Sequence, residues 1–227
     1  MAKSYANRQI VLRTRIKICG ITRVEDAAAA VSFGADAIGL IFYDPSPRVV
    51  NIQRAADIVR SLPALVHVVG VFVEPDREYV EAVLSKVRLT LLQFHGSESA
   101  EFCSGFGVPY IKTLRMSDDA DPEIYARSYP QARALLLDTY ESEGYGGTGS
   151  VFSWERAKQC QSSPVIIAGG IEASNVSAAL AKSGAYAVDV SSGVETSPGQ
   201  KDPEKIQSFI CAVRDHDQMQ KDKDGTD

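Results

Sequence analysis

Two side chains are placed to act as an acid and a base, because each one ends a short apolar run. Cys19 ends the run Arg15–Cys19, and Asp138 ends the run Ala134–Asp138. A thiolate can remove a proton, and a carboxylic acid whose pKa is raised by partial burial can supply one. The position of Cys19 alone supports a buried structural cysteine equally well, because cysteine is among the most buried residue types.

Two further apolar runs end in small residues that predict a phosphate site. One run ends in Gly169 and Gly170, and the other ends in Ser192 and Gly193. Small residues let an anion approach backbone N–H groups closely. Each end by itself is more commonly an ordinary turn, so the prediction depends on both ends lying side by side.

Three polar residues near other run ends are candidates for binding a ligand. Arg48 closes the proline-stiffened segment Asp44–Arg48 and can pair bidentately with a carboxylate, although a lone arginine is more commonly exposed to solvent. His95 would either orient a substrate or cap its strand. Asp189 would either bind a substrate or anchor the interior of the sheet.

These residues are positioned by apolar β-rich runs that alternate with alanine-rich helical segments. The predicted strands are Arg15–Cys19, Ala37–Phe42, His67–Val73, Leu89–Phe94, Tyr110–Leu114, Ala134–Asp138, Val165–Ala168 and Ala187–Val190. The predicted helices are Val24–Phe33, Ile52–Leu62, Arg77–Val87, Ser99–Gly105, Pro122–Tyr129, Trp154–Gln161, Asn175–Ser183 and Pro203–Arg214.

Strict alternation of strand and helix predicts an α/β fold with parallel strands and right-handed crossovers. Eight such units in one chain of this length favour a single-domain (β/α)₈ TIM barrel over an open doubly wound sheet. We expect residues 1–14 to be an extension, residues 15–214 to form the barrel and residues 215–227 to be a polar tail that frays. The candidate residues above would then meet at the C-terminal ends of the strands, where barrel enzymes have their active sites.

Several boundaries carry their own local signals. Thr22 and Glu25 have the spacing of a capping box at the start of the first helix. Asp121 and Asp202 each precede a proline, which predicts an N-cap, and Gly34 and Gly184 follow helices, which predicts left-handed termini.

Side-chain alternation along the first strand predicts which residues face the barrel axis. Lys17 and Cys19 would point inward, whereas Ile16 and Ile18 would face the helices. An ammonium group such as that of Lys17 and the start of the following helix are both features that lower the pKa of a nearby thiol.

The composition restricts the class of protein. The formal net charge of −5 argues against nucleic acid or an anionic membrane as a partner, and no apolar run is long enough to span a membrane. Four widely spaced cysteines without a CxxC pair indicate free thiols in a reducing cytoplasm, with neither a disulfide framework nor a zinc site. We expect a monomer or a homodimer that binds a small phosphorylated molecule and uses no cofactor or metal.

From about Arg15 to Arg214 the chain resembles the phosphoribosylanthranilate isomerase family of tryptophan biosynthesis. The most specific matches are the KICGIT string and the GGTG loop. The matching segments are Lys17–Thr22, Gly39–Phe42, Ser46–Arg48, Gly70–Val73, Leu92–Gly96, Gly146–Gly149 with Phe152 and Trp154, Ala168–Gly170 and Asp189–Glu195.

The resemblance implies an Amadori rearrangement of N-(5-phosphoribosyl)anthranilate to the 1-deoxyribulose phosphate, with no metal or organic cofactor. It implies that Asp138 protonates the ribose ring oxygen and that Cys19 removes the proton from C2′. It also implies that Arg48 holds the anthranilate carboxylate, and that Gly170 and Gly193 with their neighbours bind phosphate.

Two other functions compete with this interpretation. The related isomerase of histidine synthesis has an aspartate at the first strand end, where this chain has Cys19. A ligand-binding barrel without activity would need neither Cys19 nor Asp138.

Overall fold

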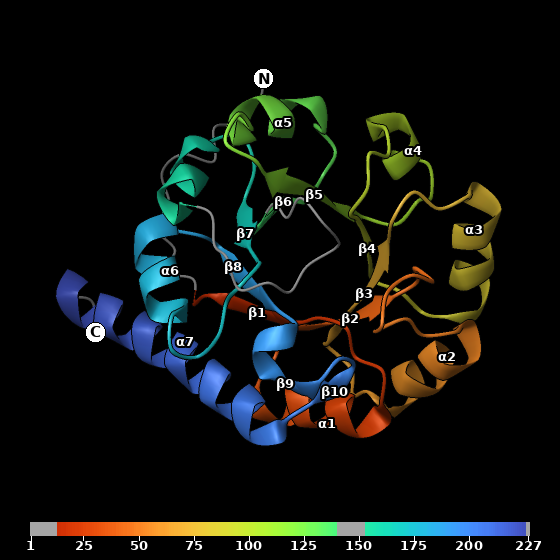
Figure 1. The fold of residues 1–227 in the computed structure, drawn as a ribbon, viewed down its shortest axis with the longest axis horizontal. Helices are drawn as coiled ribbons and strands as arrows, with labels where there is room; N and C mark the ends of the chain where they lie inside the picture. The colour runs from red at the N-terminus through yellow and green to blue at the C-terminus, as the bar shows by residue number, and fades with distance from the viewer. Residues whose placement is uncertain (1–12, 140–152, 226–227) are drawn as a thin grey trace.

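The computed structural model describes residues 13–139 and 153–225, and its centre is a closed barrel of eight parallel strands (Figure 1). Each strand pairs with the next, and the last pairs with the first in the register Lys17 to Asp189. The barrel strands are β1 Arg15–Ile18, β2 Ala37–Ile41, β3 His67–Phe72, β4 Leu91–Phe94, β5 Tyr110–Met116, β6 Ala134–Thr139, β7 Val165–Ile167 and β8 Ala187–Val190. The predicted TIM barrel is therefore confirmed.

Helices surround the barrel and connect its strands (Figure 1). They are α1 Val24–Phe33, α2 Ile52–Ser61, α3 Arg77–Lys86, α4 Ala100–Ser104, α5 Pro122–Ser128, α6 Val176–Ser183 and α7 Pro203–Asp224. Between β6 and β7 the described crossover helix is a short 3₁₀-helix, η1 Trp154–Gln159, where we predicted an α-helix. A second 3₁₀ turn, η2 Ser192–Val194, follows β8.

Alternation along the strands separates two apolar layers, as predicted for β1. Ile16 and Ile18 belong to the large core between strands and helices. Cys19 instead packs with Val69 and Val71 inside the barrel. The inward position of a thiol on β1 follows from the two-residue period of a strand.

Most of the predicted helix boundaries are confirmed, but the capping box is not. The side chains of Asp121 and Asp202 accept hydrogen bonds from backbone N–H groups of their helices, and Gly34 and Gly184 adopt left-handed conformations. At α1 the N-cap is Arg23, which makes no side-chain cap. The Thr22 hydroxyl donates to the carbonyl of Gly199 instead, so a tertiary contact has replaced the local one.

The last helix is longer than the sequence pattern indicates. We expected residues 215–227 to fray, but α7 continues to Asp224. His216 is buried beside Ser177 of α6, and Asp217 accepts hydrogen bonds from the backbone and hydroxyl of Thr14. The polar residues after Arg214 are therefore held by tertiary contacts that compensate for their lack of an apolar stripe.

A small antiparallel hairpin lies between β8 and α7, and the sequence analysis missed it. Its strands are β9 Glu195–Ser197 and β10 Gln200–Lys201. All four cysteines are free, as predicted. No helix in the described ranges 13–139 and 153–225 has the length and apolarity that crossing a membrane requires.

Candidate active site

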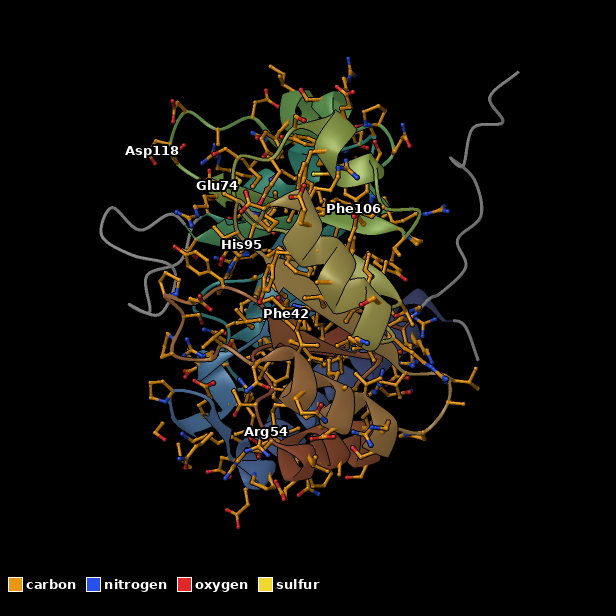
Figure 2. All side chains as sticks on the ribbon, turned by 90° about the vertical axis from the view of Figure 1, so that its right-hand side faces the viewer. Phe42, Arg54, Glu74, His95, Phe106 and Asp118 are labelled. Carbon is orange, nitrogen blue, oxygen red and sulfur yellow. The ribbon has the colours of Figure 1, made fainter. Side chains whose placement is uncertain are left out.

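A cavity of about 430 Å³ lies at the C-terminal ends of the barrel strands. Figure 2 shows the barrel from the side, with His95 and Glu74 toward the same end as Asp118, which follows β5. The cavity brings together eight of the nine predicted site residues: Cys19, Arg48, His95, Asp138, Gly169, Gly170, Asp189 and Ser192. Residues spread over the whole chain thus meet in one place, as the topology of a parallel barrel requires.

Cys19 is the first of these residues and is only 7% exposed. A Cβ atom at Gly39 on β2 would lie 2.7 Å from its Sγ atom, so the glycine makes room for the sulfur. Burial raises the pKa of the Cys19 thiol above its ordinary value, and the charge of Lys17 only partly opposes this shift. Desolvation therefore outweighs the neighbouring cation that the sequence had pointed to.

Lys17 and Asp189 form an ion pair inside the barrel, and Asp189 also lines the cavity. The Nζ–Oδ2 distance is 2.7 Å, and the two side chains are 5% and 7% exposed. Burial raises the pKa of Asp189, although Lys17 opposes the shift. The second carboxylate oxygen, Oδ1, is buried and has no hydrogen-bond partner within the described residues. Asp189 thus anchors the barrel interior and also reaches the cavity.

Asp138 at the end of β6 is paired with His95 at the end of β4. The distance from His95 Nε2 to Asp138 Oδ2 is 3.2 Å, and each side chain is 18% exposed. The Gln93 amide nitrogen lies 3.2 Å from His95 Nδ1. In the orientation that the structure gives the Gln93 amide, its NH₂ group donates to Nδ1, which leaves the Nε2 proton facing Asp138. His95 therefore bridges two strands and does more than cap its own.

The two glycines after β7 occupy positions where a residue with a side chain would not fit. Gly169 and Gly170 have φ values of 79° and 62°, which side chains rarely tolerate. A Cβ atom at Gly169 would come within 2.6 Å of Asp138 Oδ1. The glycine turn thus shapes one wall of the cavity and leaves room for the carboxylate of Asp138.

Gly193, after β8, has a different position from the other predicted phosphate residues. Ser191 and Ser192 line the cavity, but Gly193 does not. A Cβ atom at Gly193 would lie 2.2 Å from the carbonyl oxygen of Ile171, so this glycine lets the loops after β7 and β8 pack together. The two loops are adjacent, as the prediction of a shared phosphate site requires.

Arg48 is held in the wall of the cavity and is not a solvent-exposed side chain. Its Nε and Nη2 atoms donate to the carboxylate of Glu195 on β9, and its side chain is 13% exposed. Gly20 has a φ of 71°, and a Cβ there would lie 2.6 Å from Arg48 Cδ. Lys201 on β10 donates to the same glutamate at 2.7 Å.

Glu195 and Lys201 are the residues that the sequence analysis did not assign to the site. Glu195 is the last residue of the segment Asp189–Glu195, which resembles a family motif. This match is the feature of the sequence that could have pointed to Glu195. Burial alone would raise the pKa of Glu195, but the hydrogen bond from Arg48 and the charge of Lys201 hold it below its ordinary value.

The described residues contain no group of three or more His, Cys, Asp or Glu side chains that could hold a metal ion. The segment Gly146–Gly149, which carries the GGTG match, lies outside the described residues.

Comparisons with known proteins agree on one family. The family model for N-(5′-phosphoribosyl)anthranilate (PRA) isomerase matches residues 16–212. The N-(5′-phosphoribosyl)anthranilate isomerase of Pseudomonas fluorescens is 53% identical over 200 residues, which cover 88% of this chain and 95% of that protein.

Solved structures give the same result. Phosphoribosyl anthranilate isomerase from Thermotoga maritima superposes with a TM-score of 0.81 at 36% identity, covering 89% of this chain and 99% of that one. A second structure of such an isomerase, in complex with reduced 1-(o-carboxyphenylamino)-1-deoxyribulose 5-phosphate, has a TM-score of 0.77 at 35% identity and the same coverage. This chain belongs to the N-(5′-phosphoribosyl)anthranilate isomerase family.

Proposed function

We propose that Asp138 and Cys19 are the general acid and the general base of the isomerisation that this family catalyses. The reaction is the step of tryptophan biosynthesis that converts N-(5′-phosphoribosyl)anthranilate into 1-(2-carboxyphenylamino)-1-deoxyribulose 5-phosphate. The observation that carries the proposal is the cavity itself, which has a thiol from β1 and a carboxylate from β6 on its walls. A ligand that fills this cavity can meet both groups at once.

The chemistry needs one proton donor and one proton acceptor. Asp138 protonates the ring oxygen of the ribose, the bond from C1′ to that oxygen breaks, and a Schiff base forms. Cys19 as the thiolate then removes the proton from C2′, and the resulting enolamine tautomerises to the ketone. The His95 Nε2–H group, which faces Asp138, supports the position of the acid. Proton transfer by positioned groups of this kind contributes roughly 10²–10⁴ in rate.

The two charged ends of the substrate require separate binding sites. The backbone of the turns at Gly169, Gly170 and Ser192, supported by Gly193, would bind the phosphate. Arg48, on the loop after β2, would bind the anthranilate carboxylate. The relative solved with the reduced product supports a ligand of this size and charge.

The oligomeric state and location are part of the same proposal. A relative from Thermotoga maritima is described as a dimer from which monomers were generated. This chain is a monomer or a homodimer that works in the cytoplasm. Light scattering on the purified chain distinguishes the two states.

The test is a turnover assay with freshly generated phosphoribosylanthranilate, followed by the loss of substrate fluorescence. We expect turnover by the wild-type chain, only trace turnover by Asp138→Asn, and a loss of roughly 10²–10⁴ in rate for Cys19→Ser. Far-UV circular dichroism and binding of the reduced product control for folding. Full activity in either variant would exclude that residue from its role.

A further inference from the structure

The β9–β10 hairpin sets an arginine against a buried glutamate at the edge of the cavity. Arg48 comes from the loop after β2 and Glu195 from β9, and these residues are 147 positions apart in the chain. Their contact uses both carboxylate oxygens, with Nε–Oε1 at 2.9 Å and Nη2–Oε2 at 2.8 Å. Two parallel hydrogen bonds of this kind fix the plane of a guanidinium as well as its position.

The edge of the guanidinium that Glu195 occupies determines which edge remains for a ligand. Nε and Nη2 form the side edge of an arginine, and both are directed at Glu195. The end edge carries Nη1 and the second hydrogen of Nη2, and Nη1 makes no hydrogen bond with the described residues. Since Arg48 lines the cavity, this end edge can receive a second carboxylate bidentately.

Glu195 is itself held from three sides. Lys201 Nζ donates to Oε1 at 2.7 Å, the backbone N–H of Gly199 donates to the same oxygen at 3.2 Å, and Lys205 Nζ donates to the Glu195 carbonyl at 2.7 Å. The Lys201 side chain is fully buried, and the Glu195 side chain is 4% exposed. The hairpin is thus a rigid support for one carboxylate.

The charge balance also favours an incoming anion. Arg48 and Lys201 carry two positive charges, and Glu195 carries one negative charge, so the trio retains one positive charge beside the cavity. Without Glu195, two cations would repel each other, and Arg48 would have to lose side-chain freedom at each binding event.

We propose that Glu195 is a positioning residue for substrate recognition. It fixes Arg48 so that the free end edge of the guanidinium selects a substrate with a carboxylate on its aromatic ring. This inference depends on the proposed role of Arg48 as the carboxylate clamp. Glu195 itself does not touch the substrate, and it acts through Arg48.

The test compares two stable ligands that differ only in the carboxylate. Reductive amination of ribose 5-phosphate with anthranilic acid or with aniline gives a carboxylated and a carboxylate-free amine. Titration calorimetry measures both on the wild type and on Glu195→Gln, in which a donor amide faces Arg48 and Lys201. We expect Kd for the carboxylated amine to rise about tenfold or more, and Kd for the aniline amine to change by less than about twofold.

Kinetics and a matched variant separate positioning from a general structural effect. Glu98 is also a buried glutamate, 3% exposed and paired with a lysine, Lys112, at 2.8 Å, but it does not line the cavity. Glu98→Gln should not discriminate between the two amines. Glu195→Gln should raise KM with little change in kcat, because it weakens ground-state binding. Glu195→Asp keeps the charge but retracts the carboxylate, so it should give a smaller loss with the same dependence on the carboxylate.

Arg48→Ala distinguishes the failure of this inference from that of the proposed function. If Arg48→Ala does not discriminate between the amines, the carboxylate clamp is wrong and the role of Glu195 falls with it. If Arg48→Ala discriminates but neither Glu195 variant does, the clamp stands and the positioning role is overturned. An equal loss of affinity for both amines in Glu195→Gln would likewise show that Glu195 has only a structural role.

Discussion

In the proposed role as the base, Cys19 would have to ionise although its side chain is buried. A thiol acts as a base only when it is ionised, but the barrel interior disfavours the thiolate and raises its pKa. The positive charge of Lys17 opposes this rise in pKa only in part, and its ammonium group is already paired with Asp189 at 2.7 Å. The structure therefore favours the thiol form of Cys19, so the proposed base would have to form against the effect of burial.

This condition predicts a pH dependence. Because the pKa of Cys19 lies above its ordinary value, the thiolate fraction and kcat/KM should keep increasing with pH up to and beyond about pH 9. In Cys19→Asp the base is ionised at much lower pH, so the alkaline increase should disappear while activity remains. Profiles of kcat/KM from pH 6 to 10 give the comparison. An unchanged alkaline limb in Cys19→Asp would assign it to another group.

At the scale of elements, α7 closes the ring of helices and holds the start of the barrel. Asp217 accepts hydrogen bonds from the Thr14 backbone at 2.9 Å and from the Thr14 hydroxyl at 2.6 Å. Arg214 donates to the carbonyl of Gly34 at the end of α1. The last turns of α7 are thus part of the structural unit and not a tail.

Asp217→Ala should lower the free energy of unfolding by about 1–3 kcal/mol, because it leaves a buried hydroxyl and an N–H group without their carboxylate partner. Urea unfolding measures the loss. Asp215→Ala is the control, since Asp215 is exposed on the same helix and should change stability by less than about 0.5 kcal/mol. Equal values for the two variants would show that the Asp217 contact contributes nothing.

Local sequence patterns predicted some of these elements and contacts but not others. Strand and helix periods predicted the barrel and the inward position of Cys19, because burial imposes those periods. The segment Glu195–Lys201 has no apolar alternation, so its hairpin was missed. The contact of Arg48 with Glu195 depends on barrel closure across 147 positions, and no local pattern reports it. The direction of the Cys19 pKa could not be predicted from the sequence, because it depends on how completely the barrel excludes water.

At the scale of the molecule, the two ends of the barrel carry different functions. The cavity with the proposed acid and base lies at the C-terminal strand ends. At the start of the strands, Asp36 accepts hydrogen bonds from Arg13 and Arg15 at 2.9 and 3.0 Å and ties β1 to the segment before β2. These ion pairs are far from the strand ends that bear Asp138 and His95, so stability and chemistry can vary independently.

The buried thiol of Cys103 on α4 predicts alkaline instability of the whole fold. Burial raises its pKa from 9.0 to about 12. The folded state keeps this proton while the unfolded state loses it. The contribution of this proton to the free energy of unfolding is therefore complete below pH 9. It falls by about 1.4 kcal/mol per pH unit as the pH rises toward 12. Urea unfolding of Cys103→Ala should show a shallower slope above pH 9. Cys211→Ala, which removes an exposed thiol, should keep the wild-type slope.

The assignment of Asp138 as the acid and Cys19 as the base is tested most directly with a substrate that carries deuterium at C2 of the ribose. If Cys19 removes the C2′ proton, the weaker base in Cys19→Ser makes that step rate-limiting, and the deuterated substrate should react several-fold more slowly. If Asp138 drives ring opening, Asp138→Asn slows an earlier step, and any residual turnover should be insensitive to deuterium. An isotope effect in Asp138→Asn that is absent in Cys19→Ser would contradict the assignment of both residues.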